Sequence, residues 1–185
     1  MSEGWFETTL ARAQGGDEHA FGALYRLVQP GLLRYLNGIA IGAAEDVAAD
    51  SWLEVVRALH GFTGDQPHFV AWVFTIARRK AIDRGRYEAR RLTAPLDETD
   101  SYGLLEPDVA DLAERGDATA QAIALVRSLP PNQAEVVLLR VVAGLEIDQV
   151  AQMLGKSNGA VRVLTHRGLR RLGAALEPRP VREEV

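Results

Sequence analysis

Two short stretches of the chain concentrate positive charge, and their chemistry suits binding to a polyanion. Residues 74–91 hold seven basic and two acidic side chains, and residues 156–172 hold five basic side chains and no acidic one. Each stretch therefore has a charge of +5, although the chain of 185 residues has a net charge of −4. Such local charge on an acidic body is typical of a nucleic-acid footprint. The alternative is that both stretches are ordinary solvated helix faces. The presence of two clusters of equal charge makes this alternative less favoured.

The residue types that catalysis or metal binding requires are absent or scattered. The chain has no cysteine, which excludes disulfides, thiol catalysis and thiolate metal sites. Its histidines, His19, His60, His68 and His166, do not have metal-ligand spacing, and neither a glycine-rich phosphate loop nor an HExxH motif is present. We therefore expect no catalytic residue, no metal, no cofactor and no small-molecule substrate, and the chain is not predicted to be an enzyme.

Apolar residues recur at helical spacing along most of the chain, which predicts an all-α fold. The first such run contains Phe21, Leu24, Val28 and Leu32, and we expect Pro30 to kink or split it. The stretch 136–142 (VVLLRVV) would also suit a strand because of its β-branched residues. We interpret it as a helix, since Gly144 closes it and no partner strand is visible.

An acidic segment divides the sequence into two parts. Residues 93–118 hold eight acidic side chains and one arginine, and prolines and glycines interrupt them. This composition is typical of a linker. The sequence thus predicts two small helical domains, residues 1–92 and 119–177, held apart by a linker at 93–118 and followed by a tail at 178–185.

The pattern of residues 146–172 predicts a helix-turn-helix. Gly155 ends the first short helix, and Ser157 is a suitable N-cap for the second. Such a second helix packs one side on its partner and reads base edges in the major groove with the other. A plain helical hairpin with a basic surface is the alternative. On the outward side we place Asn158, Arg162, Val163, His166 and Arg167, with Arg170 and Arg171 nearer the phosphates.

Several segments together resemble one family. The stretches AEDVAADSWLEVVRAL (44–59) and FVAWVFTIARRKAIDRGRYEARR (69–91) resemble region 2 of the extracytoplasmic-function sigma factors, and residues 125–172 resemble region 4. The resemblance covers about Phe6 to Leu176. It implies a dissociable subunit of bacterial RNA polymerase, whose region 2 grips core polymerase and opens the −10 promoter element. Region 4 of that family reads the −35 element as duplex DNA.

The resemblance also assigns roles to residues of the first domain. The polymerase-binding helix of the family presents an acidic and polar stripe, where this chain has Asp46, Asp50, Glu54 and Arg57, with Ala49 at a position that is usually glutamine. Single-stranded −10 DNA requires a basic channel and stacking surfaces. We expect Arg79 and Lys80 to lie in the short loop with which the family captures a flipped base. The full set predicted to bind −10 DNA is Trp72, Arg78, Arg79, Lys80, Arg84 and Arg86.

The expected partners are core RNA polymerase, promoter DNA and an anti-sigma factor, since members of this family are commonly held inactive by one. No signal peptide and no membrane span are visible, so we expect a cytoplasmic protein without a membrane partner. The main alternative is a helix-turn-helix transcriptional regulator that acts without polymerase. That alternative explains residues 146–172 but leaves the region 2 pattern without a role.

Overall fold

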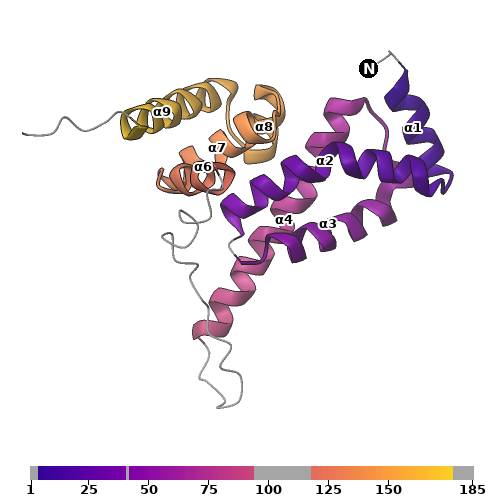
Figure 1. Ribbon diagram of the computed structural model, residues 1–185, viewed down its shortest axis with the longest axis horizontal. Coiled ribbons are helices and arrows are strands. Elements are labelled where there is room, and N and C mark those ends of the chain that lie inside the picture. The colour runs from indigo at the N-terminus through magenta and orange to yellow at the C-terminus, as the bar shows by residue number, and fades with distance from the viewer. Residues whose placement is uncertain (1–3, 41, 94–117, 177–185) are drawn as a thin grey trace, which may run out of the picture.

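A computed structural model describes residues 4–40, 42–93 and 118–176, and these ranges fold into helices without a strand (Figure 1). The expectation of an all-α fold is confirmed. The predicted linker falls almost wholly on residues 94–117 and the predicted tail on 178–185, and both of these ranges lie outside the described residues.

The first half of the chain forms a helical bundle. In order it contains α1 (Trp5–Gln14), α2 (Glu18–Ile39), α3 (Ala44–Ala58), the short 3-10 helix η1 (Leu59–Gly61) and α4 (Gln66–Thr93). Asp17 is the N-cap of α2. Its carboxylate accepts hydrogen bonds from the backbone N–H groups of His19 at 2.9 Å and Ala20 at 3.0 Å.

Pro30 does not split α2, contrary to that part of the expectation. The helix runs through it from Glu18 to Ile39, with Pro30 itself exposed. Proline removes one backbone hydrogen bond from a helix interior. Leu24 and Leu32 on either side of it are fully buried, and this packing holds the helix together across the gap.

The basic stretch 74–91 lies entirely on α4, a helix of 28 residues. Phe69, Val73, Phe74 and Ala77 are buried on its inner side and fix it to the bundle. Figure 1 shows the last turns of α4 extending beyond α2 and α3. The basic side chains of these turns therefore lie on a part of α4 that projects from the bundle.

The second half begins at α6 and ends with the longest helix of this half. It contains α6 (Ala118–Arg127), α7 (Pro131–Val137), the π-helical turn η2 (Leu138–Val142), α8 (Ile147–Leu154) and α9 (Asn158–Leu176). Pro131 occupies the first turn of α7, where its missing N–H is not needed. The helical interpretation of residues 136–142 is confirmed, with Val136 and Leu138 fully buried.

The two halves pack against each other, whereas the sequence predicts that the linker holds them apart. α2 lies beside α6, α7 and η2, and α4 contacts α8 (Figure 1). Buried apolar residues form one continuous core that includes Leu36 of α2, Phe74 of α4 and Leu139 of η2. The apolar content of 136–142 was visible in the sequence, but the partner against which it would be buried was not.

Candidate nucleic-acid interface

A tight turn between α8 and α9 sets the orientation of the second basic stretch. Reciprocal hydrogen bonds between Glu146 and Gln149 form a capping box at the start of α8. Gly155 ends α8 with a φ of 62°, a left-handed conformation that favours glycine. The hydroxyl of Ser157 accepts a hydrogen bond from the backbone N–H of Ala160 at 3.2 Å. The predicted helix end and N-cap are thus confirmed.

α9 presents one side to its own domain and the other to solvent. Val161 and Gly168 are buried on the inner side. A Cβ at Gly168 would lie 2.7 Å from Cγ2 of Val137, so only glycine lets α9 approach α7 this closely. All residues that the sequence places on the outward side are exposed, namely Asn158, Arg162, Val163, His166, Arg167, Arg170 and Arg171.

The positive charge of α9 is open to solvent. The helix contains four arginines and no acidic residue. None of the ion pairs between described residues involves an arginine of α9. Arg171 donates a hydrogen bond to the neutral amide oxygen of Gln133 at 3.0 Å, which leaves its charge uncompensated. A phosphate approaching this surface meets cations without a carboxylate competitor.

The basic residues of α4 are instead surrounded by carboxylates. Glu54 of α3 pairs with both Arg79 and Lys80, the latter at 2.9 Å. Arg84 pairs with Glu88 at 2.8 Å and lies 3.4 Å from a carboxylate oxygen of Asp46. These are surface pairs, each worth about 0–1 kcal/mol, so a DNA phosphate can compete with them.

Two further cations of α4 are also paired. Arg86 lies 3.6 Å from a carboxylate oxygen of Asp83 on the same helix. Arg78 donates a hydrogen bond from Nε to Glu135 of α7 at 2.7 Å, and both side chains are mostly buried. Partial burial opposes the charge of Arg78, but the hydrogen bond and the negative charge of Glu135 outweigh it and raise the pKa of Arg78. Arg78 therefore lies between the two halves of the molecule.

The expectation that Arg79 and Lys80 lie in a short loop is wrong. Both are in the middle of α4, which the buried residues Phe69 to Ala81 hold as one helix. The loop on this side of the bundle comes earlier, at residues 62–65, where Gly64 has a φ of 148°. The signal was present in the sequence HGFTGDQP (60–67), whose glycines and proline are typical of a loop.

Trp72 lies next to this loop as part of an aromatic cluster. Its ring is half-buried, with its centroid 4.9 Å from that of Phe62 and 5.9 Å from that of Phe69. Phe62 belongs to the loop and Phe69 to the core beneath it. The cluster ties the loop to α4, and it leaves Trp72 with an accessible portion beside the exposed residues Thr63 and Asp65.

The outer face of α3 combines acidic and apolar side chains. Asp46, Asp50 and Arg57 are exposed, as the predicted polymerase contact requires, whereas Glu54 is partly covered by its ion pairs with α4. The sequence reasoning missed Leu53, which is 55% exposed on the same face, and Val56, which is 54% exposed and lines a hollow with Ala13 and Phe21 of α1 and α2. Their signal was available, because both are apolar residues that lie off the buried stripe of α3.

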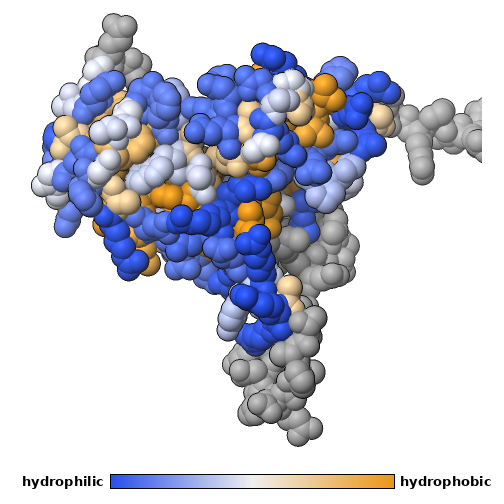
Figure 2. Space-filling view, turned by 180° about the vertical axis from the view of Figure 1, so that it is seen from behind, coloured by the Kyte–Doolittle hydropathy of each residue, from blue (hydrophilic) through white to orange (hydrophobic). Residues whose placement is uncertain are grey.

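A further missed residue lies near the end of α4. Tyr87 is 59% exposed among basic neighbours, and its ring contacts no other aromatic ring within the described residues. In Figure 2 this end of α4 is mostly hydrophilic up to the grey atoms. An aromatic ring among arginines is the combination on which bases of single-stranded DNA stack.

Within the ranges that the structure describes, histidine and acidic side chains do not gather into a group of three or more that could hold a metal ion. No described helix is long and apolar enough to cross a bilayer. The arrangement of the described residues thus consists of two basic helices and one acidic-apolar face, all at the surface.

Family models match both halves of the chain. The model for Sigma-70 region 2 matches residues 21–91, and the model for Sigma-70, region 4 matches residues 119–172. Curated relatives match across 90% of this chain. The ECF RNA polymerase sigma factor ShbA of Streptomyces griseus is 38% identical over 181 residues, which cover 90% of this chain and 92% of that protein.

Two other relatives show the same pattern. The ECF RNA polymerase sigma factor BldN of Streptomyces coelicolor is 32% identical over 169 residues, and the match covers 90% of this chain but 64% of BldN. The ECF RNA polymerase sigma factor SigD of Mycobacterium tuberculosis is 29% identical over 173 residues, which cover 90% of this chain and 81% of SigD.

Solved structures agree with the fold. CnrH, solved in complex with the cytosolic domain of CnrY, superposes with a TM-score of 0.64 at 25% identity, over 92% of this chain and 96% of CnrH. RpoE of Bartonella quintana, solved with the anti-sigma factor NepR, gives a TM-score of 0.63 at 19% identity, over 85% of this chain and 98% of RpoE. By the two matched regions and the 38% identity to ShbA over 90% of its length, this chain belongs to the extracytoplasmic-function (ECF) family of RNA polymerase sigma factors.

Proposed function

We propose that this chain binds core RNA polymerase and directs it to promoters, where region 2 engages the −10 element and region 4 reads the −35 element. The observation that carries the proposal is the presence, in one chain, of an acidic-apolar face on α3 and an open basic recognition helix α9. A DNA-binding module alone would need only α9. We take residues 1–92 as the region 2 domain and 119–177 as the region 4 domain.

For duplex recognition we propose that α9 enters the major groove of the −35 element. Arginine can bond bidentately to guanine, and the exposed side chain of Val163 can contact a thymine methyl group. Arg162, Val163 and His166 lie on the first turns of α9, which suits base contact in a helix-turn-helix. Arg170 and Arg171 lie further along the helix and suit phosphates.

For the −10 element we propose that single-stranded DNA follows α4 and the loop at residues 62–65. Because Arg79 and Lys80 are helical, the loop beside Trp72 is the better candidate for holding an extruded base. Arg84, Arg86 and Tyr87 would extend the path along the projecting end of α4. These contacts require the ion pairs with Glu54, Asp46 and Asp83 to exchange for phosphates.

For polymerase binding we propose the outer face of α3. Asp46 and Asp50 would face basic residues of the partner, while Leu53 would be buried on binding. Exposed apolar side chains within a charged surface are typical of protein–protein contact sites. The absence of a glutamine at Ala49 removes one polar contact from this face.

The remaining roles follow from the family. We propose that the chain acts in the cytoplasm, has no catalytic activity of its own, and is regulated by a protein partner of the anti-sigma kind. CnrH, to which it is similar, was solved with the cytosolic domain of CnrY bound. The acidic residues of 93–118 would occupy a channel built for RNA.

Reconstituted transcription tests the proposal. The purified chain is incubated with core RNA polymerase and a library of promoter DNA, and the transcripts are mapped. We expect association with core polymerase and start sites that share −10 and −35 sequences. Specific binding to duplex DNA without association with polymerase would instead support the alternative, a regulator that acts alone. If the chain neither associates with core polymerase nor directs it to promoter start sites, the proposal is refuted.

A further inference from the structure

We infer that Gln14 of α1 is a positioning residue for reading the −10 element, because it holds the loop at residues 62–65 in the shape that receives an extruded base. The inference deepens the proposed function and rests on it for the role of this loop in DNA binding. The match to the Sigma-70 region 2 model begins at residue 21, so Gln14 is not part of the matched segment.

One end of the loop is held by a side chain that is distant in the sequence. The half-buried amide of Gln14 donates hydrogen bonds from Nε2 to the backbone carbonyl of Leu59 at 2.9 Å and to that of Phe62 at 2.8 Å. One amide nitrogen carries two hydrogens, so it can bond both carbonyls at once. The carbonyl of Phe62 lies just past the end of η1, where no further helical N–H follows to bond it. Gln14 therefore joins α1 to the start of η1 and to the first residue of the loop.

The other end of the loop is held by α4 itself. Asp65 directly precedes this helix, and its carboxylate accepts a hydrogen bond from the backbone N–H of His68 at 3.0 Å and lies 2.6 Å from Nδ1 of the same residue. A Cβ at Gly64 would lie 3.1 Å from Cβ of His68 and 3.2 Å from Cζ of Phe62, so the loop is closely packed on the start of α4. The end at Asp65 thus depends on local contacts, whereas the end at Phe62 depends on α1.

The position of Gln14 is itself well defined. Gln14 is the last residue of α1, and Arg12 one turn earlier pairs at 2.6 Å with Asp17, the N-cap of α2. This pair closes the turn that follows Gln14. At the other end of α1, the ring of Phe6 packs on that of Phe69 in α4, with the centroids 5.7 Å apart. α1 is therefore attached to the bundle on both sides of Gln14 and can act as a fixed support for the loop.

Gln14 acts on the base-binding surface through Phe62. The ring of Phe62 lies 4.9 Å from that of Trp72 at an interplanar angle of 32°. While Gln14 holds the carbonyl of Phe62, this ring stays against Trp72 and the exposed loop residues stay beside it. Without these hydrogen bonds the carbonyl can turn toward water, and the loop gains backbone freedom that DNA binding must remove again. The hydrogen bonds of Gln14 therefore lower the cost of ordering the loop on a base.

The mobility of the loop in the chain alone tests the structural part of the inference. The sequence contains no cysteine, so Thr63→Cys on the exposed loop gives a single site for a spin label. We expect restricted label motion when Gln14 is present and faster motion when Gln14→Met is added. Methionine has about the length and helix propensity of glutamine but no hydrogen-bond donor, so the helix content should not change.

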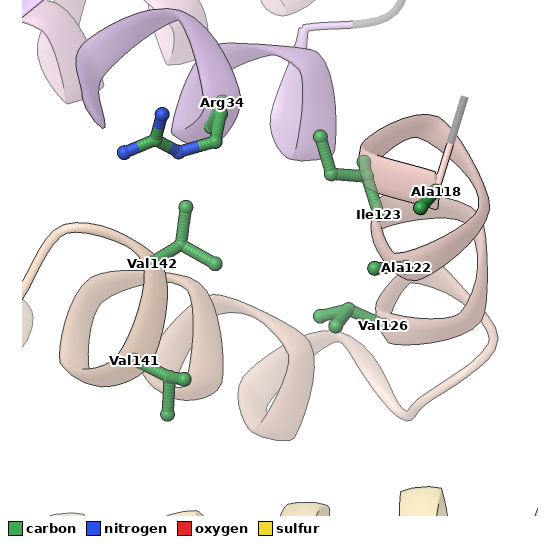
Figure 3. A pocket seen from close by; sticks show the side chains of 7 residues that line it. All are labelled: Arg34, Ala118, Ala122, Ile123, Val126, Val141 and Val142. Carbon is green, nitrogen blue, oxygen red and sulfur yellow. The ribbon is translucent and has the colours of Figure 1, made fainter. Parts of the chain in front are cut away.

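A matched control and a rescue separate the hydrogen bonds from general effects. Gln121→Met makes the same replacement at an exposed position of α6, a helix that borders the hollow around Arg34 and Val142 (Figure 3). Arg34 lies in the last turns of α2, whereas Gln14 precedes the first turn of that helix, so this control should leave the label motion unchanged. Gln14→Lys supplies donors to both carbonyls again and should restore the restricted motion.

Base selection by the polymerase holoenzyme tests the functional part. In a promoter recovered from the library, 2-aminopurine replaces each non-template base of the −10 element in turn, and its fluorescence rises where a base leaves the stack. Each of the four natural bases is then placed at that position, and promoter opening is measured. Gln14→Met should lower the preference for the best base by about three- to tenfold, the size expected for the loss of one intramolecular hydrogen bond. Gln14→Lys should recover the preference, and base preferences at the other −10 positions should not change.

The two readouts distinguish the ways in which the inference can fail. Unchanged label motion in Gln14→Met would refute the claim that Gln14 holds the loop. Faster motion with an unchanged base preference, or with an equal loss of opening for all four bases, would show a structural role only and would refute the positioning role. If the original chain directs no promoter-specific starts while Gln14→Met still frees the loop, the proposed function fails and the support of the loop by Gln14 stands.

Discussion

The basic stretches of region 2 (74–91) and region 4 (156–172) carry the same charge of +5 in the sequence, but they differ in their surroundings. Arg78, Arg79, Lys80, Arg84 and Arg86 of α4 all have carboxylate partners. The arginines of α9 have none among the described residues. The basic surface of α9 is therefore open to DNA. The paired cations of α4 can bind DNA only when their carboxylate partners release them.

This difference follows from what each helix packs against. α4 lies against α3, whose acidic stripe includes Asp46 and Glu54, and against α7 through Glu135. α9 packs on α7 and α8 through Val161 and Gly168, and its outer side meets only solvent. The acidic residues of α3 can thus interact with two partners, namely polymerase and the DNA-binding cations of α4. Binding of polymerase to α3 would weaken the hold of its carboxylates on α4.

The largest effect is expected from reversing one charge on the α3 face. Asp50 is exposed and forms no ion pair within the described part of the chain, so its charge is free to face a partner of α3. Asp50→Lys should weaken binding to core polymerase by about 3 kcal/mol, because like charges opposed at an interface cost several kcal/mol. Titration of labelled chain with core polymerase measures the affinity.

Its control is a charge reversal away from this face. Glu7→Lys on α1 makes the same change in net charge at an exposed helical position. It should leave the affinity for polymerase within the error of the measurement, and both variants should keep their helix content. Normal polymerase binding by Asp50→Lys would move the polymerase contact off α3.

The next effect concerns the open helix of region 4. Arg162→Ala should cost about 1–3 kcal/mol in −35 duplex recognition and relax the sequence preference at one position, if Arg162 bonds bidentately to a base. Arg170→Ala should weaken binding to all sequences alike and reduce the salt dependence by about one phosphate contact. Promoter libraries transcribed with each variant distinguish these results. An unchanged profile for Arg162→Ala would remove it from the base-reading set.

A stacking residue on α4 should have a smaller effect. Tyr87→Ala should lower the affinity of polymerase holoenzyme for single-stranded or forked −10 DNA by about 1–2 kcal/mol, since stacking of a base on an aromatic ring is worth about this much. Tyr87→Phe keeps the ring and should behave like the original chain. Equal losses for both variants would indicate a role for the hydroxyl instead.

Features that depend on local rules were predictable from the sequence, whereas contacts between distant segments were not. The helix-turn-helix was predictable because Gly155 and Ser157 act through local backbone rules, and the outward side of α9 follows from helical periodicity alone. The predicted loop at Arg79 was wrong because the apolar spacing of Phe69, Val73 and Ala77 already requires a helix that continues through this position. The pairing of Arg78 with Glu135 joins residues 57 positions apart, and no local pattern reports such contacts.

The smallest effect is the most direct test of the contrast between α4 and α9. Glu54→Gln removes the carboxylate shared by Arg79 and Lys80 and should raise the affinity of the chain for single-stranded DNA about two- to fivefold, because a surface ion pair is worth about 1 kcal/mol or less. Asp50→Asn changes the net charge equally on the same helix without releasing a cation, so it should raise the affinity less. Binding is measured at several salt concentrations, and only Glu54→Gln should steepen the salt dependence, because newly available cations displace more counterions from the DNA. If both variants gain equally, the gain comes from net charge, and the carboxylates of α3 do not hold the cations of α4 back from DNA.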